Sequence, residues 1–136
     1  FFLGRVEKLY YCLIDGLFFG SSTISTLLLK NKRILKNFSR KFVSLLLIKA
    51  IHCFKNYTLV SIFLYTGKKH QIRICCSYFN YVVAGENKYI LNYGRFEHKK
   101  LFLHARSVKF FITCNVHCFA QASFDYYFCF VVFFML

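Results

Sequence analysis

The spacing of apolar and polar positions before residues 66–73 (TGKKHQIR) differs from the spacing after them. Residues 57–65 (YTLVSIFLY) are rich in β-branched and aromatic side chains and apolar on both faces, which is typical of an interior strand. After the turn predicted at Thr66-Gly67, apolar side chains recur with helical spacing, which predicts a helix over residues 70–80. The apolar stripe of that helix consists of Ile72, Cys75, Cys76 and Phe79, and its polar flank carries His70, Arg73 and Ser77.

The rest of the chain is predicted to form mainly strands. Strands are predicted at 8–14, 22–29, 42–54, 102–113 and 116–122, and the third forms an antiparallel hairpin with 57–65 through Lys55-Asn56. Residues 30–33 and 36–41 are basic loops, residues 85–100 are expected to form a polar surface loop, and a short helix or strand begins at Phe124. The sum predicts one α+β domain over residues 1–136, with a mixed, mainly antiparallel sheet and flanking helices.

The net charge of the chain limits the kinds of binding partner to be expected. The chain has 19 Lys and Arg against 5 Asp and Glu, a net charge of +14, which favours a polyanion and above all nucleic acid. The 57% of hydrophobic residues make an anionic membrane surface the second candidate. The longest apolar run, residues 126–136, is about half of the ~20 residues that a spanning helix needs, so no integral membrane segment is predicted.

Two lysines, Lys68 and Lys69, stand at the predicted helix start. There they oppose the helix dipole at a cost of about 0.3–1 kcal/mol each when exposed. An anion held by the free backbone N–H groups would offset that cost, whereas solvated loop lysines remain the alternative.

The seven cysteines show no pairable framework. Cys114, His117 and Cys118 could bind a metal ion, but no second ligand pair follows at zinc spacing. Small buried thiols in a reducing cytosol are favoured, and neither a metal nor a cytoplasmic disulfide is predicted.

Four stretches resemble the RluA-type pseudouridine synthases, in order and with matching spacing. Residues 66–73 resemble the signature T-G-[RK]-x-H-Q-I-R, and residues 80–89 (NYVVAGENKY) resemble G-H-P-[IV]-x-G-D-x-x-Y. Residues 101–110 (LFLHARSVKF) resemble the L-F-L-H-A stretch, and residues 8–16 (KLYYCLIDG) resemble the strand that carries the family's active-site tyrosine. The resemblance covers roughly residues 4 to 128. Residues 8–16 and residues 66–73 are most similar to the RluC branch of the family.

The resemblance implies the isomerisation of uridine to pseudouridine in RNA, without a cofactor, by an aspartate acting on a flipped-out base. Tyr10 would stack on the base, Arg73 would pair with the aspartate, and Ile72 with Leu103 would form apolar walls. The plain alternatives are that Tyr10 and Leu103 are core residues and that Arg73 is a surface cation. The candidate RNA-phosphate contacts are Lys68, Lys69, His70, Lys32, Arg33 and Arg40.

The aspartate itself is the main departure from the family. The family presents it in an R-L-D-x-x-T-S-G motif before the tyrosine strand, and this sequence contains no such motif. Neither Asp15 nor Asp125 has that context. The sequence begins with Phe1 and shows no signal peptide, so we expect the C-terminal part of a pseudouridine synthase, inactive alone.

Further departures are single residues in the second motif: Tyr81, Val82, Glu86 and Ile90 stand where the family has His, Pro, Asp and Gly. The expected substrate is large-subunit ribosomal RNA in the cytoplasm, with no obligate protein partner. Two alternatives stay open: a non-catalytic basic RNA-binding remnant, and a peripheral membrane protein that uses its aromatic tail.

Overall fold

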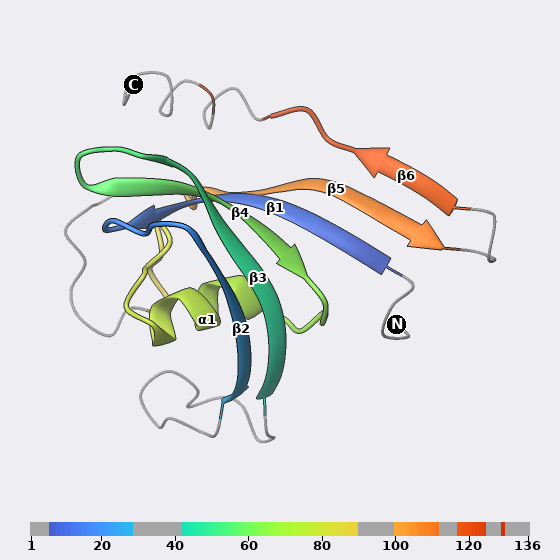
Figure 1. Cartoon of the computed structure of the whole chain (residues 1–136), viewed down its shortest axis with the longest axis horizontal. Helices are drawn as coiled ribbons and strands as arrows, with labels where there is room; N and C mark the ends of the chain where they lie inside the picture. Colours follow the sequence, from blue (N-terminus) through green and yellow to red (C-terminus); the bar gives the residue numbers. More distant parts are fainter. Residues whose placement is uncertain (1–5, 29–41, 90–99, 112–116, 125–128, 130–136) are drawn as a thin grey trace.

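The described part of the chain forms one antiparallel sheet with a helix against it (Figure 1). The computed structural model describes residues 6–28, 42–89, 100–111, 117–124 and 129. The elements are β1 (Val6–Asp15), β2 (Ser21–Leu28), β3 (Phe42–Cys53), β4 (Tyr57–Leu64), α1 (Gln71–Tyr78), β5 (Leu103–Phe111) and β6 (His117–Gln121). The strand order is β2-β3-β4-β1-β5-β6, so the first strand of the chain lies inside the sheet.

The predicted strands are confirmed, including the hairpin of β3 and β4 and the return of β6 beside β5. Two parts of the predicted architecture differ from what is observed. All five strand pairings are antiparallel, so the described sheet is not mixed. The described residues contain one helix rather than several flanking helices, because the other connections that the structure describes are turns or extended loop segments.

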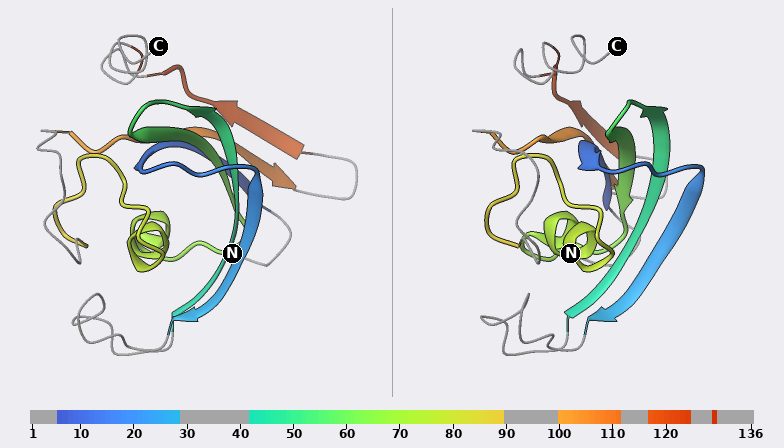
Figure 2. Two further views of the ribbon diagram at one scale, coloured as in Figure 1. Left: turned by 60° about the vertical axis from the view of Figure 1, so that its left-hand side comes forward. Right: turned by 90° about the vertical axis from the view of Figure 1, so that its left-hand side faces the viewer.

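The sheet is strongly curved, and α1 lies on its concave side (Figures 1 and 2). Alternate residues of the central strands point toward the helix and are buried there, as Cys12 and Ile14 are on β1 and Val60 and Ile62 on β4. Full burial of a Val or Ile side chain contributes about 1.5–3 kcal/mol to stability. The interface between α1 and the sheet buries several such side chains and forms the main hydrophobic core.

The helix buries a wider face than its apolar stripe predicted. Ile72, Cys75 and Cys76 are buried as expected, but Phe79 is 40% exposed, and Ile74 is fully buried instead. Ser77, predicted on the polar flank, is also buried. The helix lies inside a curved sheet, so side chains beyond a single stripe meet the concave wall.

Residues 81–89 pack against the sheet rather than standing away from it. Ile14 and Val83 form a β-bridge, and the Ala84 N–H donates to the Leu13 carbonyl. Gly85 has φ +81°, and a Cβ there would collide with the Lys100 carbonyl. The predicted polar surface loop is therefore wrong for Glu86 and Tyr89, which are buried, whereas Asn87, Lys88 and Lys100 are exposed as predicted.

Candidate functional site

The start of α1 is fastened to the sheet by one buried glutamine. Gln71 is 2% exposed, and its Nε2 donates to Thr66 Oγ1 at 2.6 Å while its Oε1 accepts the Lys68 N–H at 3.0 Å. Thr66 Oγ1 in turn accepts the Leu45 N–H of β3 at 3.0 Å. These bonds connect the turn, the helix and a neighbouring strand, which explains why Gln occupies this position of the turn-to-helix motif.

His70 stands at the N-cap of α1 with left-handed backbone angles, φ 56° and ψ 24°, and no side chain caps the helix. Its Nδ1 lies 2.7 Å from the Tyr89 hydroxyl, and the two rings meet edge to face. The pKa of His70 is lowered, first by burial and then by the positive charges of Arg73, Lys88 and Lys69. The helix start therefore lies in a positive electrostatic environment.

Arg73 and Glu86 form a bidentate ion pair one turn further into the helix. Arg73 Nε lies 2.6 Å from Glu86 Oε2, and Nη2 lies 2.7 Å from Oε1. The exposed fractions of the two side chains are 17% and 0%, respectively. The Arg73 guanidinium also lies over the Tyr89 ring, with Cζ 5.3 Å from its centroid.

The Glu86 carboxylate is held by the loop as well as by Arg73. Its Oε1 accepts the backbone N–H groups of Lys88 at 2.7 Å and Tyr89 at 3.2 Å. Burial raises the pKa of Glu86, but the bonds from Arg73 and these N–H groups outweigh it, and the pKa lies below its ordinary value. Both oxygens are therefore occupied, and Glu86 is unsuited to act as a nucleophile or a general base.

Tyr10, Ile72 and Leu103 lie in one apolar cluster between α1 and the sheet. Ile72 belongs to its buried core, and the half-buried Tyr10 and Leu103 pack against it. Beside Tyr10 the ladder between β1 and β5 shifts: Leu9 pairs with Ser107, but Tyr10 pairs with Ala105. A bulge of this kind re-aims neighbouring side chains and is frequent beside active sites.

The predicted site residues are thus only partly brought together. The cluster joins Tyr10 to the predicted apolar walls, whereas Arg73 turns toward Glu86 and Tyr89. Lys68 and Lys69 are exposed at the helix start, and Lys32, Arg33 and Arg40 lie outside the described residues. Cys114 of the alternative metal site is also outside them, and the described residues contain no group of three or more potential metal ligands.

Sequence reasoning missed Glu86 and Tyr89. It required a carboxylate partner for Arg73 but assigned residues 85–100 to a polar loop. The similarity of residues 80–89 to the family's second motif, with its acidic residue and tyrosine, was the signal that could have found both.

The comparisons with known proteins agree with this geometry. No protein-family model matches the chain. A curated relative, the ribosomal large subunit pseudouridine synthase C of Buchnera aphidicola subsp. Baizongia pistaciae (strain Bp), is 29% identical over 119 residues. The resemblance to the RluA-type pseudouridine synthases is confirmed. The matched region covers 79% of this chain and 38% of that relative, so the match spans less than two fifths of the relative's length.

Two solved structures show the same fold. Human RNA pseudouridylate synthase domain containing 1 has a TM-score of 0.71 at 23% identity, over 88% of this chain and 55% of that one. Human RNA pseudouridylate synthase domain containing 4 has a TM-score of 0.67 at 16% identity, over 91% and 60% of the two chains. No helix among the described residues is long and apolar enough to cross a membrane.

Proposed function

We propose that the chain is the C-terminal portion, residues 1–136, of the catalytic domain of an RNA pseudouridine synthase. Its proposed substrate is large-subunit ribosomal RNA in the cytoplasm, after the name of the curated relative. The observation that carries this proposal is the ion pair of the partly buried Arg73 with the buried Glu86, beside the cluster of Tyr10, Ile72 and Leu103. The chain spans about two fifths of that relative, so the catalytic aspartate is proposed to belong to the part not covered.

The proposed reaction is an isomerisation, in which the same base is re-attached to the ribose through a different ring atom. The bond between C1′ of the ribose and N1 of uracil breaks, and a bond between C1′ and C5 forms. The proton leaves C5, and N1 gains one from solvent. Such a reaction needs a carboxylate at the ribose or base and an apolar site that holds the detached ring, which are the roles proposed here for the absent aspartate and the walls.

Arg73 is proposed to orient that aspartate. Glu86 holds Nε and Nη2, and among the described residues Nη1 has no hydrogen-bond partner. A guanidinium fixed along one edge presents its remaining donor in a defined direction, which favours pairing with a second carboxylate. Glu86 therefore acts as a positioning residue, and Tyr10 is proposed to stack on the extruded uracil.

The RNA backbone would be held by cations around this site. Lys68, Lys69 and His70 are proposed as phosphate contacts at the helix start. The basic residues Lys32, Arg33 and Arg40 extend the proposed contact surface along the sequence.

A chimera tests the proposal. This chain would replace the matched region of the curated relative, and the chimera would be incubated with ribosomal RNA carrying tritium at C5 of its uridines. We expect tritium release from the chimera and none from this chain alone. Arg73→Gln should reduce release by about 100-fold or more, because one charge-assisted donor is lost from the reacting centre.

Lys49→Gln, an exposed lysine on β3, is the matched control and should leave release unchanged. A folded chimera that binds RNA but releases no tritium would reject the catalytic proposal and favour the non-catalytic RNA-binding remnant. The net charge of +14 supports this non-catalytic function as well, because binding to RNA needs only positive charge and no catalytic residue.

A further inference from the structure

Two lysines from distant parts of the sequence flank one contact on the surface. His70 and Tyr89 are 19 positions apart and are joined through Nδ1 and the hydroxyl at 2.7 Å. Lys69 immediately precedes His70, and Lys88 immediately precedes Tyr89. The bond between helix and loop therefore brings the two exposed lysines to the same region of the surface.

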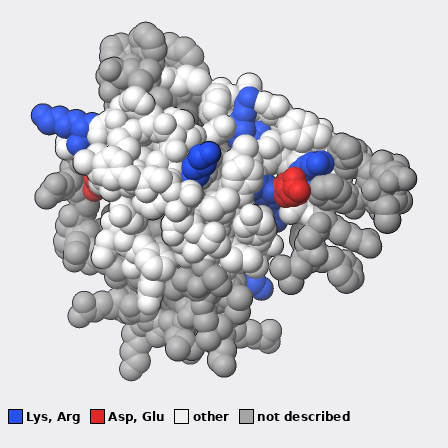
Figure 3. Space-filling view, in the orientation of Figure 1, with Lys and Arg blue, Asp and Glu red and all other residues white. Residues whose placement is uncertain are grey.

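Their positive charge is not neutralised locally. Both lysines lower the pKa of His70, after burial and Arg73 and against the opposing effect of Glu86, so both lie near this histidine. Among the described residues neither Lys69 nor Lys88 has a carboxylate partner, and the nearby Glu86 is already bound to Arg73. The described part of the face seen in Figure 3 is largely uncharged, and on its right-hand side cations lie against an acidic side chain.

The base of the Lys88 side chain is fixed. Its backbone N–H donates to the buried Glu86 carboxylate at 2.7 Å, and its Nζ lies 5.6 Å from the centroid of the Tyr89 ring. A lysine on an anchored backbone loses less conformational entropy on binding than one on a free loop. Lys88 is thus better placed to bind an anion than an ordinary surface lysine.

We propose that Lys69 and Lys88, braced by the contact between His70 and Tyr89, form a phosphate-binding surface for single-stranded RNA. Lys88 is a new contact residue, absent from the contacts expected from the sequence. This inference rests on the RNA partner of the proposed function. RNA is favoured over a lipid surface because the two exposed residues that precede His70, Lys68 and Lys69, and the two that precede Tyr89, Asn87 and Lys88, carry no apolar side chain to insert among lipids.

RNA binding by the whole chain tests the surface. The affinity for a labelled single-stranded RNA oligonucleotide would be measured over a range of salt concentrations for the wild type, K69Q, K88Q and the double variant. Each substitution should reduce the slope of log K against log salt by about 0.7, the value for one phosphate contact on a single strand. The double variant should bind at least about tenfold more weakly at low salt.

Two variants separate this surface from general charge loss. K49Q removes the same charge from β3 and should bind like the wild type, whereas K88R should retain binding because it keeps the cation. Equal weakening by K49Q and K88Q, with thermal unfolding unchanged, would overturn the inference and leave the proposed function standing. A wild-type chain that binds anionic vesicles but no RNA would overturn both.

Discussion

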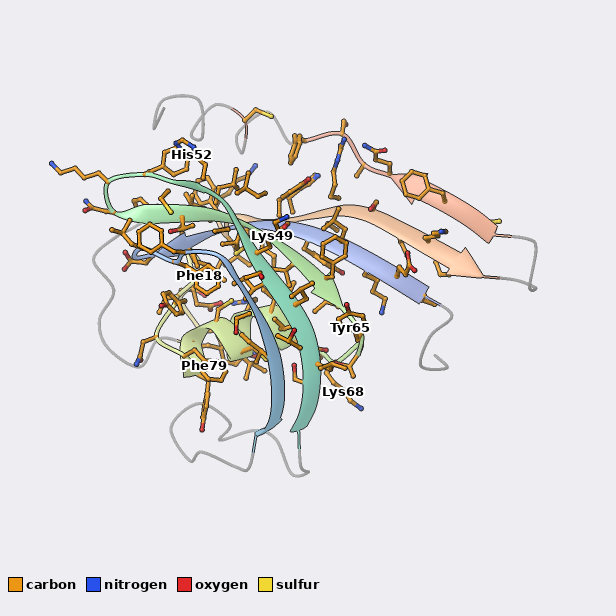
Figure 4. The ribbon with its side chains drawn as sticks, in the orientation of Figure 1. Phe18, Lys49, His52, Tyr65, Lys68 and Phe79 are labelled. Carbon is orange, nitrogen blue, oxygen red and sulfur yellow. The ribbon has the colours of Figure 1, made fainter. Side chains whose placement is uncertain are left out.

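The two ends of α1 differ sharply in chemistry, although the helix is only eight residues long. The N-terminal end gathers His70, Arg73, Glu86 and Tyr89 into one network of hydrogen bonds and charge. The C-terminal end lines an open, uncharged pocket of about 200 Å³. Figure 4 shows Phe18 and Phe79 at this second end and Lys68 at the other.

The apolar end is built from aromatic rings on different elements. The ring centroids of Phe18 and Tyr81 lie 5.5 Å apart, edge to face, and Phe79, Ile24 and Ile48 line the same pocket. Such packing needs only approximate volume, whereas the polar end needs defined donors and acceptors. We therefore expect substitutions at the polar end to have the larger effects.

The largest effect is expected from Glu86→Ala. It leaves Arg73 partly buried without its carboxylate and removes the acceptor of two backbone N–H groups. The free energy of unfolding should fall by about 3 kcal/mol or more, as for other broken buried ion pairs. Urea denaturation measures it, and the exposed neighbour Asn87→Ala serves as control. Equal stabilities of these two variants would show that the polar end is not the more demanding one.

Gln71→Ala should have the next largest effect. It removes the donor to Thr66 and the acceptor for the Lys68 N–H, and it leaves that partly buried N–H without its partner. A loss of about 2 kcal/mol is expected. Thermal unfolding of Q71A beside K68A, which removes only an exposed side chain, checks this. A Q71A melting temperature within error of that of K68A would contradict the role assigned to the glutamine.

Acid should weaken the polar end selectively. The pKa of Glu86 is lower in the folded chain than its ordinary value of 4.5, so its stabilisation is complete above about pH 4.5 and disappears as pH falls through the folded pKa. Glu86→Gln should be less stable at neutral pH and should lose less stability on acidification. Unfolding free energies measured between neutral pH and about pH 3 test the sign. If the wild type and Glu86→Gln lost the same unfolding free energy on acidification, the assigned role of Glu86 in the pH dependence would be refuted.

The smallest effect is expected from Phe79→Ala at the apolar end. Phe79 is 40% exposed, so the substitution removes only part of a buried ring. We expect a loss of about 1 kcal/mol or less, well below that for Glu86→Ala. Ile74→Ala, a fully buried residue of the same helix, is the positive control and should cost about 2–5 kcal/mol. A Phe79→Ala loss as large as that of Glu86→Ala would reverse the comparison.

Much of the fold follows from local sequence. The strand predicted at residues 8–14 is β1, Val6–Asp15, and the helix predicted at 70–80 is α1, Gln71–Tyr78. Those predictions succeed because apolar periodicity reflects which neighbouring residues face one wall. The position of β1 between β4 and β5 did not follow, because strand order depends on contacts between distant segments.

The candidate site divides in the same way. Sequence by itself determined the basic charge, the turn-to-helix motif with Arg73, the tyrosine strand and the resemblance that connects them, because each of these is a property of neighbouring residues or of composition. The tertiary structure decided that Glu86, 13 positions away, is the partner of Arg73, and that Lys88 lies beside the helix start. The path of the loop across the sheet produces both contacts, and that path depends on packing between segments that are far apart in the sequence.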